Sequence, residues 1–465
     1  MSTLEADYLV IGAGAMGLAF TDTLVSESDA RVVIVDRHDQ PGGHWTTAYP
    51  FVRLHQPSAY YGVNSRALGS DTIDQFGYNS GFFELASGAE VCAYFDAVMR
   101  QHLLPTGRVT YLPMSEYLGA GRVRTFSGDD YEVSARRVVT SHVEIVVPSM
   151  RRPSYRVSPG VHCVPPNDLP RFRDGRDRYV IVGAGKTAMD ACLWLLRHGV
   201  DPARLTWIKP RESWVLDRAA IQPGRKFAGA VLGDFANQMA AVHEASSLPD
   251  LFERLEAKGC LMRIDLSVEP TMYRCAILSQ AELEQLRRIE DVVRMGHVTA
   301  LEPGRITLED GVRDIGGSVL YIDCSADGLA HREPTPVFDG DHISLQTVRT
   351  CQPAFSASVI AHVEATYADD ETRNAYCGPV PYPREPIDWL RMMYAFNNNQ
   401  LKWFSDPDMM AWTDAARLNV LHHVSAAVSE RARERIISML TSQLPVINDK
   451  LESLLAEAPQ VRATL

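Results

Sequence analysis

The sequence has few cysteines, and none of them are closely spaced. Eight cysteines are distributed over 465 residues, at positions 92, 163, 192, 260, 275, 324, 351 and 377. No two form a C-x-x-C pair or stand at the spacing of a metal-ligand set, so we expect no metal site. Reduced thiols in a cytoplasmic protein are the simplest interpretation of this distribution.

The sequence also lacks a long apolar run and an excess of basic residues. No stretch of about 20 apolar residues occurs, which argues against a membrane-spanning helix. The first residues include Glu5 and Asp7 and lack the basic start of a signal peptide, so we expect a cytoplasmic location and no membrane partner. Lys and Arg number 46 and Asp and Glu 58. The resulting formal charge of −12 argues against a nucleic-acid partner.

What the chain has is an ordinary globular composition and a repeated motif. Apolar residues make up 46% and charged residues 22% of the sequence, which is typical of folded domains with large cores. The length is enough for roughly three domain-sized units. Two of these units are indicated by glycine-rich turns, one near the N-terminus and one near the middle.

The first glycine turn predicts a dinucleotide site. A strand-like apolar segment leads into the sequence G-A-G-A-M-G, followed by a helical pattern and a second apolar strand that ends at Asp36. Gly12 allows the tight turn, Gly14 lets the backbone approach a pyrophosphate, and Gly17 lets the helix pack against the strand. The free amides at the start of the helix bind phosphates. Asp36 can accept hydrogen bonds from a ribose.

A second copy of this pattern begins at residue 178. A strand-like segment precedes the sequence G-A-G-K-T-A, and the next strand ends without an acid, at Lys209 and Arg211. Because Lys and Arg attract a ribose 2′-phosphate that a carboxylate would repel, this unit favours NADPH over NADH. Solvated loop residues are the other interpretation of the two bases. The expected NADPH contacts of the glycine turn are Gly183, Gly185, Lys186 and Thr187.

These motifs predict an α/β fold with two Rossmann-like dinucleotide-binding domains. We expect the first domain to be discontinuous, over residues 1–175 and 311–465, and to end in a helical C-terminal region. The second domain is expected over residues 176–310. It contains a largely helical insert at residues 219–291.

Further residues carry a resemblance to a known family. The sequence P-G-G-H-W at 41–45, then Tyr49-Pro50, Arg53 and S-A-Y-Y at 58–61, resembles the G-G-x-W…Y-P…R…S…Y segment of class B flavin monooxygenases. That group contains the flavin-containing monooxygenases and the Baeyer–Villiger monooxygenases. The run R-E-S-W-V-L-D-R at 211–218 is similar to the R-x-x-W-V-x-x-R run of the same group. The resemblance extends over residues 5–330, and no motif of the group matches the C-terminal hundred residues.

The resemblance implies two cofactors and a reaction. FAD would bind the first unit and NADPH the second, and NADPH would reduce the flavin by hydride transfer. The reduced flavin would then take up O₂ to form a C4a-peroxide that oxygenates a small-molecule substrate, which the sequence does not identify. The expected FAD contacts are Gly12, Gly14, Gly17, Asp36, Arg37, Gly43, His44 and Trp45.

The chain also departs from the family pattern. The usual linker fingerprint is missing, and T-S-H stands at 140–142 in place of an early A-T-G turn. Baeyer–Villiger relatives have an acid shortly after the position of Arg53, where this chain has His55 and Gln56. Heteroatom hydroxylation is therefore favoured over Baeyer–Villiger insertion. The expected catalytic roles are an amide donor at Gln56 and a proton source at His55. Arg53 would pair either with a phosphate of FAD or NADP or with a nearby acid.

Three other functions stay open at this stage. An FAD-dependent NAD(P)H dehydrogenase or oxidase would share the fold but oxygenate no substrate. A non-catalytic redox sensor would bind both dinucleotides without turnover. A disulfide reductase would need two cysteines a few residues apart beside the flavin, and the flavin unit offers only the distant Cys92 and Cys163. Because a fold supports many functions, the choice depends on the site.

Overall fold

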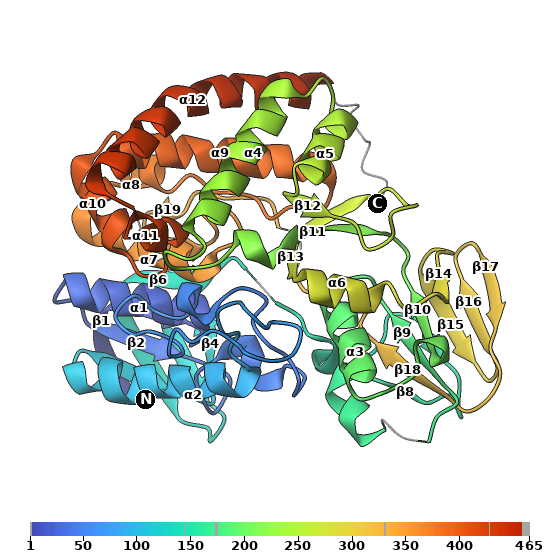
Figure 1. Ribbon diagram of the computed structural model, residues 1–465. Coiled ribbons are helices and arrows are strands. Elements are labelled where there is room, and N and C mark those ends of the chain that lie inside the picture. Colours follow the sequence, from blue (N-terminus) through green and yellow to red (C-terminus); the bar gives the residue numbers. More distant parts are fainter. Residues whose placement is uncertain (1, 144, 173–174, 330–331, 427, 458–465) are drawn as a thin grey trace.

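The computed structural model describes residues 2–143, 145–172, 175–329, 332–426 and 428–457. Figure 1 shows three bodies: the first dinucleotide unit at the lower left, the second at the lower right, and a helical cap above both. The cap combines two segments that are far apart in sequence, the insert of the second unit and the C-terminal helices. No helix among the described residues is long and apolar enough to span a bilayer.

The first unit is built on a mainly parallel sheet with strand order β3-β2-β1-β6-β20-β19. All pairs from β3 to β20 are parallel, and β19 pairs antiparallel with β20. The hairpin β4–β5 extends from β6. The strands are β1 (Ser2–Ile11), β2 (Val32–Val35), β3 (Val109–Leu112), β4 (Ser115–Gly119), β5 (Arg122–Thr125), β6 (Asp130–Ser141), β19 (Phe338–Asp339) and β20 (His342–Leu345).

Helices complete the core of this unit. The helix after the glycine turn, α1 (Ala15–Glu27), is buried over ten consecutive residues, and α7 (Pro353–Thr366) packs closely against it. The helix α2 (Gly88–Val98) begins at a capping box, in which Ser87 and Glu90 exchange side-chain and backbone hydrogen bonds. The short helix α8 (Asp370–Tyr376) lies beside β19.

The second unit repeats the parallel arrangement with strand order β14-β10-β9-β18-β8. All four pairs in this sheet are parallel. The strands are β8 (Cys163–Val164), β9 (Arg178–Val182), β10 (Leu205–Ile208), β14 (Val292–Val293) and β18 (Val319–Asp323), and the helices that pack on each other beside them are α3 (Lys186–Arg197) and α6 (Gln280–Leu286). A smaller sheet joins β7 (Arg156–Val157), β15 (Val298–Glu302), β16 (Arg305–Leu308) and β17 (Gly311–Asp314).

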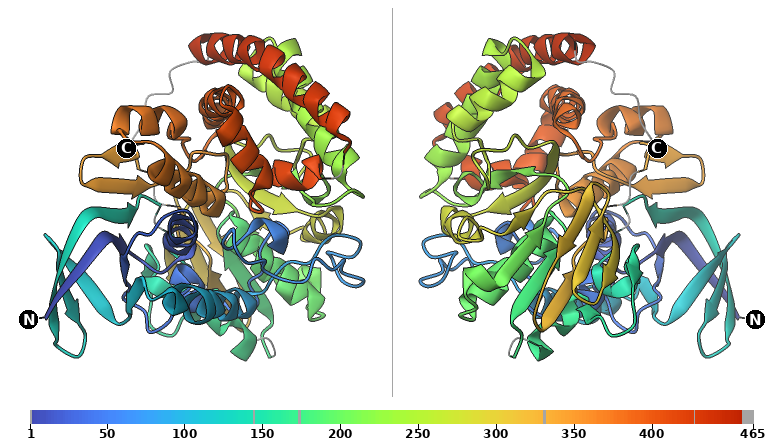
Figure 2. Two further views of the ribbon diagram at one scale, coloured as in Figure 1. Left: turned by 90° about the vertical axis from the view of Figure 1, so that its left-hand side faces the viewer. Right: turned by 90° about the vertical axis from the view of Figure 1, so that its right-hand side faces the viewer.

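The cap has its own apolar core between the insert and the C-terminal helices. Trp214, Phe252 and Trp389 are buried there from three different segments of the chain. Helix α12 packs against α9 and α4 and forms the top of the molecule in both side views (Figure 2). The cap elements are β11 (Ser213–Asp217), α4 (Ala228–Glu244), α5 (Leu248–Ala257), β12 (Leu261–Met262), β13 (Met272–Leu278), α9 (Pro386–Phe404), α10 (Pro407–Ala415), α11 (Val420–Ser425) and α12 (Glu430–Glu457).

The predicted fold class is confirmed, since each of the two glycine turns connects a strand of a mainly parallel sheet to a helix. The extent of the second unit differs from the prediction. Strand β8 lies before residue 176, and strand β18 lies after residue 310, yet both pair within the second sheet. The insert is mainly helical as predicted, but it also contains β13, which pairs with β11. Residues 458–465 of the predicted first domain lie outside the described residues.

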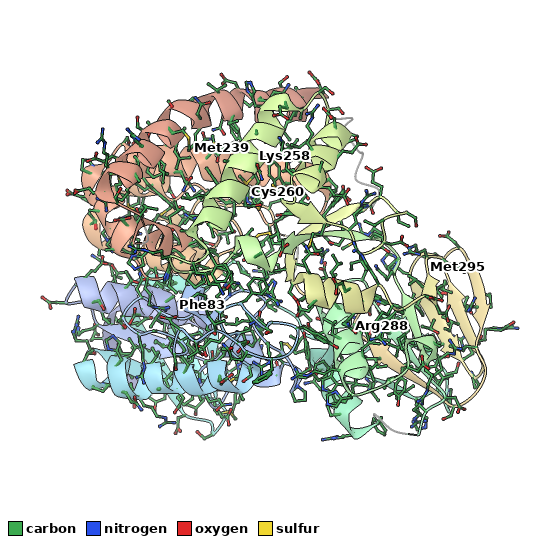
Figure 3. All side chains as sticks on the ribbon, viewed as in Figure 1. Phe83, Met239, Lys258, Cys260, Arg288 and Met295 are labelled. Carbon is green, nitrogen blue, oxygen red and sulfur yellow. A yellow bond between two sulfur atoms is a disulfide. The ribbon has the colours of Figure 1, made fainter. Side chains whose placement is uncertain are left out.

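Loops of the first unit reach the cap as well as the second unit. Phe83, labelled in Figure 3, lies at the upper edge of the first unit below α4. Its ring lies 6.0 Å from that of Phe227, which precedes α4, and its backbone N–H donates to Gln222 at 2.9 Å. The loop that contains Phe83 therefore contacts the residues that lead into α4 of the cap.

Candidate active site between the two dinucleotide units

The first glycine turn has the geometry of a phosphate cradle. Gly12 has φ +105°, which favours glycine, and no atom lies within 4 Å of where its Cβ would stand. A Cβ on Gly17 would overlap the carbonyl oxygen of Gly12, so only glycine lets α1 pack this closely against the turn. Gly14 caps the start of α1. The open space at Gly12 is suited to a pyrophosphate on the free amides of the helix.

A second pair of glycines faces this turn. Gly42 donates its backbone N–H to the carbonyl of Ala13 at 2.9 Å. A Cβ on Gly43 would stand 3.1 Å from the Cα of Gly14, and the φ of Gly43 is +57°. The G-G pair of the family motif is thus placed directly against the glycine turn, where two backbones approach without side chains between them.

The predicted FAD contacts after these glycines are held by local interactions. Trp45 donates its indole N–H to the hydroxyl of Tyr61 at 2.7 Å, and their rings meet edge to face. His44 lies next to the Trp45 ring, and burial lowers the pKa of His44 to about 4, so its imidazole is neutral. Trp45 is therefore fixed in orientation by a partner that the sequence motif also contains.

Asp36 lies at the end of β2, beside the glycine turn, as the motif requires. It is 6% exposed. One carboxylate oxygen accepts the backbone N–H of Ala13 at 2.5 Å, and the other accepts the backbone N–H of His38 at 2.7 Å. Arg37 is exposed and has no ion-pair partner among the described residues. The acid is thus positioned next to the cradle, and its oxygens have local donors in this conformation.

The second glycine turn reproduces the first. Gly183 has φ +132°, and a Cβ there would stand 2.6 Å from the carbonyl oxygen of Cys324. No atom lies within 4 Å of a Cβ added to Gly185, which caps α3. The first two residues of α3 are Lys186, which forms an ion pair with Asp190 one turn later, and Thr187. This turn also leaves an open cradle at a helix N-terminus.

The two bases after β10 differ from each other, which corrects one expectation. Lys209 is 1% exposed and forms an ion pair with Glu212, and its ammonium lies 4.3 Å from the centre of the Trp207 ring. The interpretation of Lys209 as a free phosphate partner is therefore wrong, because its charge is already buried and neutralised. Arg211 is 38% exposed, and its nearest acid is Glu385 at 4.0 Å. Arg211 alone remains available to a 2′-phosphate.

A cleft of about 500 Å³ separates the two dinucleotide units. It follows α3 from its first residue to its end on one side and two loops of the first unit on the other. Phe51 of the first unit stacks on Trp194 of α3, with ring centres 5.3 Å apart. The charged side chains that line the cleft are Arg53, Asp74, Lys186, Asp190, Arg197, Arg218 and Glu282.

A hydrogen bond joins the two units across the start of this cleft. Tyr49, which belongs to the family motif of the first unit, donates its hydroxyl to Asp190 of α3 at 2.7 Å. Burial and the negative charge of Asp190 raise the pKa of Tyr49 well above its ordinary value, so the hydroxyl remains a donor. Because Asp190 also binds Lys186, the first turn of α3 is linked directly to the loop of the first unit that contains Tyr49.

The predicted catalytic residue His55 is held by the cap. Its Nδ1 accepts the backbone N–H of Ile277 in β13 at 3.2 Å, and its carbonyl accepts from Arg218 at 3.2 Å. Burial and the charges of Lys186 and Arg218 lower the pKa of His55 to about 3. The imidazole is therefore neutral, with its proton on Nε2. The expected role as a proton source near neutral pH is wrong, and a hydrogen-bond donor remains.

The other two predicted catalytic residues are less constrained. Arg53 is exposed in the cleft, donates to the carbonyl of Leu85 at 2.8 Å, and has no acid within ion-pair distance among the described residues. Gln56 is half-buried next to His55, and no hydrogen bond of its side chain occurs within the described chain. Arg53 and His55 are close in sequence, and the loop that contains them lies beside α3.

Sequence reasoning missed Arg218 as a residue that connects the three bodies. Its guanidinium is fully buried and donates to Glu282 of α6 at 2.7 Å, to Asn79 of the first unit at 3.2 Å, and to the carbonyl of His55. The R-x-x-W-V-x-x-R run contained Arg218, so the signal was present. Its partners are distant in sequence, and only the fold identifies them.

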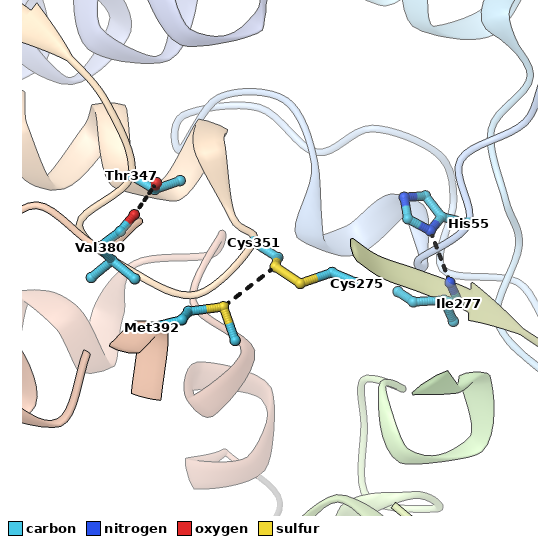
Figure 4. Close-up of a disulfide and its surroundings, with 7 residues drawn as sticks. All are labelled: His55, Cys275, Ile277, Thr347, Cys351, Val380 and Met392. Carbon is cyan, nitrogen blue, oxygen red and sulfur yellow. Dashed lines mark hydrogen bonds between the residues drawn. A yellow bond between two sulfur atoms is a disulfide. The ribbon is translucent and has the colours of Figure 1, made fainter. Parts of the chain in front are cut away.

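The structure also corrects the expectation that all the cysteines are reduced. Cys275 of β13 and Cys351, just before α7, form a disulfide across 76 residues with Cα atoms 6.6 Å apart (Figure 4). Both residues have positive φ, +52° and +47°. The bond links the cap to the first unit, two residues from the backbone N–H that binds His55. The other six cysteines are free.

Metal-ligating side chains do not cluster in the described part of the chain. No group of three or more His, Cys, Asp or Glu side chains within the described ranges could hold a metal ion.

Comparisons with known proteins agree with the fold of the first unit. Residues 10–66 match the family model described as an NAD(P)-binding Rossmann-like domain. A ferredoxin–NADP reductase of Ralstonia pickettii is 25% identical over 252 residues, which are 53% of this chain and 62% of that protein.

Solved structures similar to the chain include two proteins named as monooxygenases. A flavin monooxygenase mutant from Stenotrophomonas maltophilia is 16% identical, with a TM-score of 0.46 over 81% of this chain and 100% of its own. A steroid monooxygenase bound to NADP is 13% identical, with a TM-score of 0.45 over 97% of this chain and 98% of its own.

Two mycobacterial proteins are much more similar. The uncharacterized protein Rv2000 of Mycobacterium tuberculosis (strain ATCC 25618 / H37Rv) is 57% identical over 460 residues, which cover 98% of this chain and 86% of that protein. The uncharacterized protein Mb2023 of Mycobacterium bovis has the same identity and coverage. The chain therefore belongs to the family of these uncharacterized mycobacterial proteins.

Proposed function

We propose that the chain is an FAD- and NADPH-dependent oxidoreductase, a monooxygenase that oxygenates a small organic substrate with O₂. The observation that supports this most directly is the pair of open glycine turns with matching backbone. The residues that cap their helices, Gly14 and Gly185, have φ and ψ of −83° and −176° and of −82° and −179°. Tyr49 and Asp190 join the two units beside one cleft.

The first unit fits FAD. The open position at Gly12 would accept the pyrophosphate, and the amides at the start of α1 would bind it. Asp36 lies where a ribose would reach its carboxylate. Gly43 lets the G-G pair approach the same place, so His44 and Trp45 would stand beside the bound cofactor.

The second unit fits NADPH. Gly185 leaves the cradle open, and Lys186 and Thr187 begin the helix whose amides would bind the phosphates. Arg211, exposed and only weakly paired, would bind the 2′-phosphate. When both cofactors are bound, they supply hydride transfer and the activation of O₂, and the protein supplies orientation and exclusion of water.

The loop that follows the first cradle provides the polar groups of the reaction site. His55, neutral and fixed by Ile277, would present its Nε2 proton as a hydrogen-bond donor and would not release it. Gln56 would offer an amide, and the unpaired Arg53 would attract a phosphate or an anionic substrate into the cleft. The stacked Phe51 and Trp194 would exclude water from one wall.

Heteroatom hydroxylation is the finer proposal. The position at which Baeyer–Villiger relatives have an acid, shortly after Arg53, is occupied by His55, whose ring is neutral. A neutral donor supports binding of a developing negative charge but cannot act as the carboxylate of those relatives. We therefore favour an amine or thioether substrate over a ketone.

Flavin spectroscopy tests the proposal. The purified protein should be yellow or become yellow with FAD, and NADPH should bleach it under anaerobic conditions. After O₂ is added, a transient absorbance distinct from that of reduced and oxidised flavin should precede the return of the oxidised spectrum. Direct return with stoichiometric H₂O₂ would instead identify an oxidase.

A dehydrogenase without oxygenation is the second candidate. The Ralstonia relative named ferredoxin–NADP reductase supports it, because that name joins NADP to an electron-transfer partner. In that case bleaching by NADPH should be followed by fast reoxidation with an artificial electron acceptor and slow reoxidation in air. Binding of both dinucleotides without bleaching would favour the redox sensor.

A further inference from the structure

A second, separate site lies in the first unit at Arg349. This residue is on the loop between β20 and α7, and it is 7% exposed. Its guanidinium has no acid within ion-pair distance among the described residues, and its Nε is buried without a hydrogen-bond partner. Burial lowers the pKa of Arg349 to about 10, so the side chain remains charged at neutral pH. A buried, charged and unpaired guanidinium requires an explanation.

Aromatic rings offset only part of this cost. The guanidinium lies 4.9 Å from the centre of the Phe396 ring and 5.7 Å from that of Phe355. Such cation–π contacts recover less free energy than the burial of an unpaired charge consumes. The two rings also give the charge apolar surroundings.

A second unpartnered donor faces the same charge. Tyr60 is 1% exposed, and its hydroxyl has no hydrogen-bond partner among the described residues. Burial raises the pKa of Tyr60, and the nearby positive charge of Arg349 opposes that shift. Gln352, on the same loop as Arg349, also has a buried side-chain oxygen without a donor. Since buried polar groups of native proteins are nearly always paired, these atoms indicate a ligand.

The loop that carries Arg349 is fixed at several points. The backbone N–H groups of Val348 and Arg349 donate to Ser356 at 3.2 and 3.3 Å, and Asn399 donates to the carbonyl of Val348 at 2.8 Å. Figure 4 shows two further ties, from Thr347 to Val380 and from Cys351 to Cys275. A charge on so rigid a loop is positioned in advance, as binding sites require.

We propose that Arg349 and Tyr60 form a binding site for an anionic group, a carboxylate on an aromatic or apolar body. Arg349 would donate two parallel hydrogen bonds, Tyr60 a third, and the Phe355 and Phe396 rings would contact the body of the ligand. Tyr60 directly follows the segment of His55 and Gln56, while Arg349 does not line the cleft between the units. Identifying the anion as the substrate's carboxylate rests on the flavin-dependent function proposed above, because an anionic group of FAD has the same chemistry.

The test compares Arg349→Met with Arg373→Met. Arg373 is a matched control, since it is also 7% exposed and lies 5.8 Å from the Phe338 ring, but it is paired with Glu364 and Asp370 at 3.0 and 2.8 Å. In the ligand-free protein, Arg349→Met should melt at or above the wild-type temperature, because an uncompensated charge is removed. Arg373→Met should melt at a lower temperature.

Ligand binding provides the second readout, with benzoate as the probe anion. Calorimetry on the ligand-free protein should show benzoate binding at least tenfold weaker in Arg349→Met than in wild type, with Arg349→Lys in between. If benzoate weakens and the affinity for FAD is unchanged, the site takes a substrate carboxylate. If benzoate does not bind wild type and FAD affinity falls tenfold in Arg349→Met, the anion belongs to the cofactor.

Other results would overturn the proposal. A loss of stability in Arg349→Met equal to that in Arg373→Met would make Arg349 a structural cation. Unchanged affinities for both benzoate and FAD would also rule out the site. The benzoate measurement needs no flavin, so a protein that never binds FAD would refute the proposed function without deciding this site.

Discussion

The two dinucleotide units share a turn but differ in what surrounds it. Gly12 and Gly183 have positive φ, and Gly14 and Gly185 cap the following helices with almost the same backbone angles. The residues after the second strand differ in charge and in their partners. Asp36 accepts the backbone N–H of its own glycine turn, whereas Lys209 is buried in an ion pair with Glu212. The shared turn thus specifies a phosphate site, and its surroundings decide which nucleotide is bound.

The third position of the motif shows the same division. Gly17 allows no Cβ, because α1 lies directly on the carbonyl of Gly12. The corresponding residue of the second unit is Ala188, which is fully buried without conflict. Glycine is therefore required where the helix lies closest to the turn and is dispensable where the helix stands slightly farther away. The predictions below test this comparison, from the largest expected effect to the smallest.

The largest effect is expected at the third motif position. In Gly17→Val the new side chain cannot avoid the Gly12 carbonyl without moving α1, so we expect a loss of at least about 3 kcal/mol of unfolding free energy. Ala188→Gly, the control, should cost about 1 kcal/mol. Chemical denaturation measures both. Equal losses at the two positions would mean that the helices lie equally close to their turns.

The next largest effect is expected on nucleotide binding at the two glycine turns. Gly185→Val should weaken NADPH binding roughly 100-fold, about 2.7 kcal/mol, and leave FAD loading unchanged, because the space beside Gly185 is empty and the fold can accommodate the side chain. Gly14→Val should reduce FAD loading and leave NADPH binding intact. Equilibrium titrations with each nucleotide test the pair. Reversed losses would exchange the cofactor assignment of the two units.

The bases after β10 should separate stability from nucleotide choice. Lys209→Met leaves Glu212 with Arg294 as its remaining cation, so we expect a loss of about 3 kcal/mol of stability and the same preference between NADPH and NADH. Arg211→Ala should change stability little and weaken NADPH about tenfold relative to NADH. Melting temperatures and nucleotide titrations measure both. A preference that changes only in Lys209→Met would contradict the assignment.

The effect that is smallest at neutral pH comes from two buried histidines, and it appears as a pH dependence of stability in acid. Burial lowers the pKa of His44 to about 4, and burial with two nearby cations lowers that of His55 to about 3. In the unfolded chain both titrate near about 6.5, so between pH 6.5 and about 4 the unfolded state binds more protons. Stability should therefore be full above pH 6.5 and fall as the pH decreases through this range.

Substitution of these histidines tests the sign and the size of that slope. His44→Gln and His55→Gln should each reduce the fall in unfolding free energy between pH 6.5 and 4, while the exposed control His297→Gln should not. Denaturant titrations at several pH values provide the measurement. A slope unchanged in both variants would mean that the two rings take up protons in the folded protein.

The sequence was sufficient for the fold class and for the local geometry of the two glycine turns. The glycine spacing, the apolar strands and Asp36 specify local geometry, because a turn with positive φ and a helix that starts at once depend on residues close in the chain. Gly43 of the G-G pair lies against Gly14 of the turn, and its predicted contact with FAD stays a prediction. These features involve contacts that a motif of a few dozen residues contains.

Only the tertiary structure decided the features that depend on distant partners. The sequence predicted Lys209 to be a free base, whereas in the structure it is buried against Glu212 and Trp207. The sequence predicted His55 to be a proton source near neutral pH, whereas burial and the charges of Lys186 and Arg218 lower its pKa to about 3. The Cys275–Cys351 bond and the unpaired charge of Arg349 arise where the cap meets the first unit. Solvation, charge pairing and burial are set by neighbours in space, which spacing along the chain does not encode.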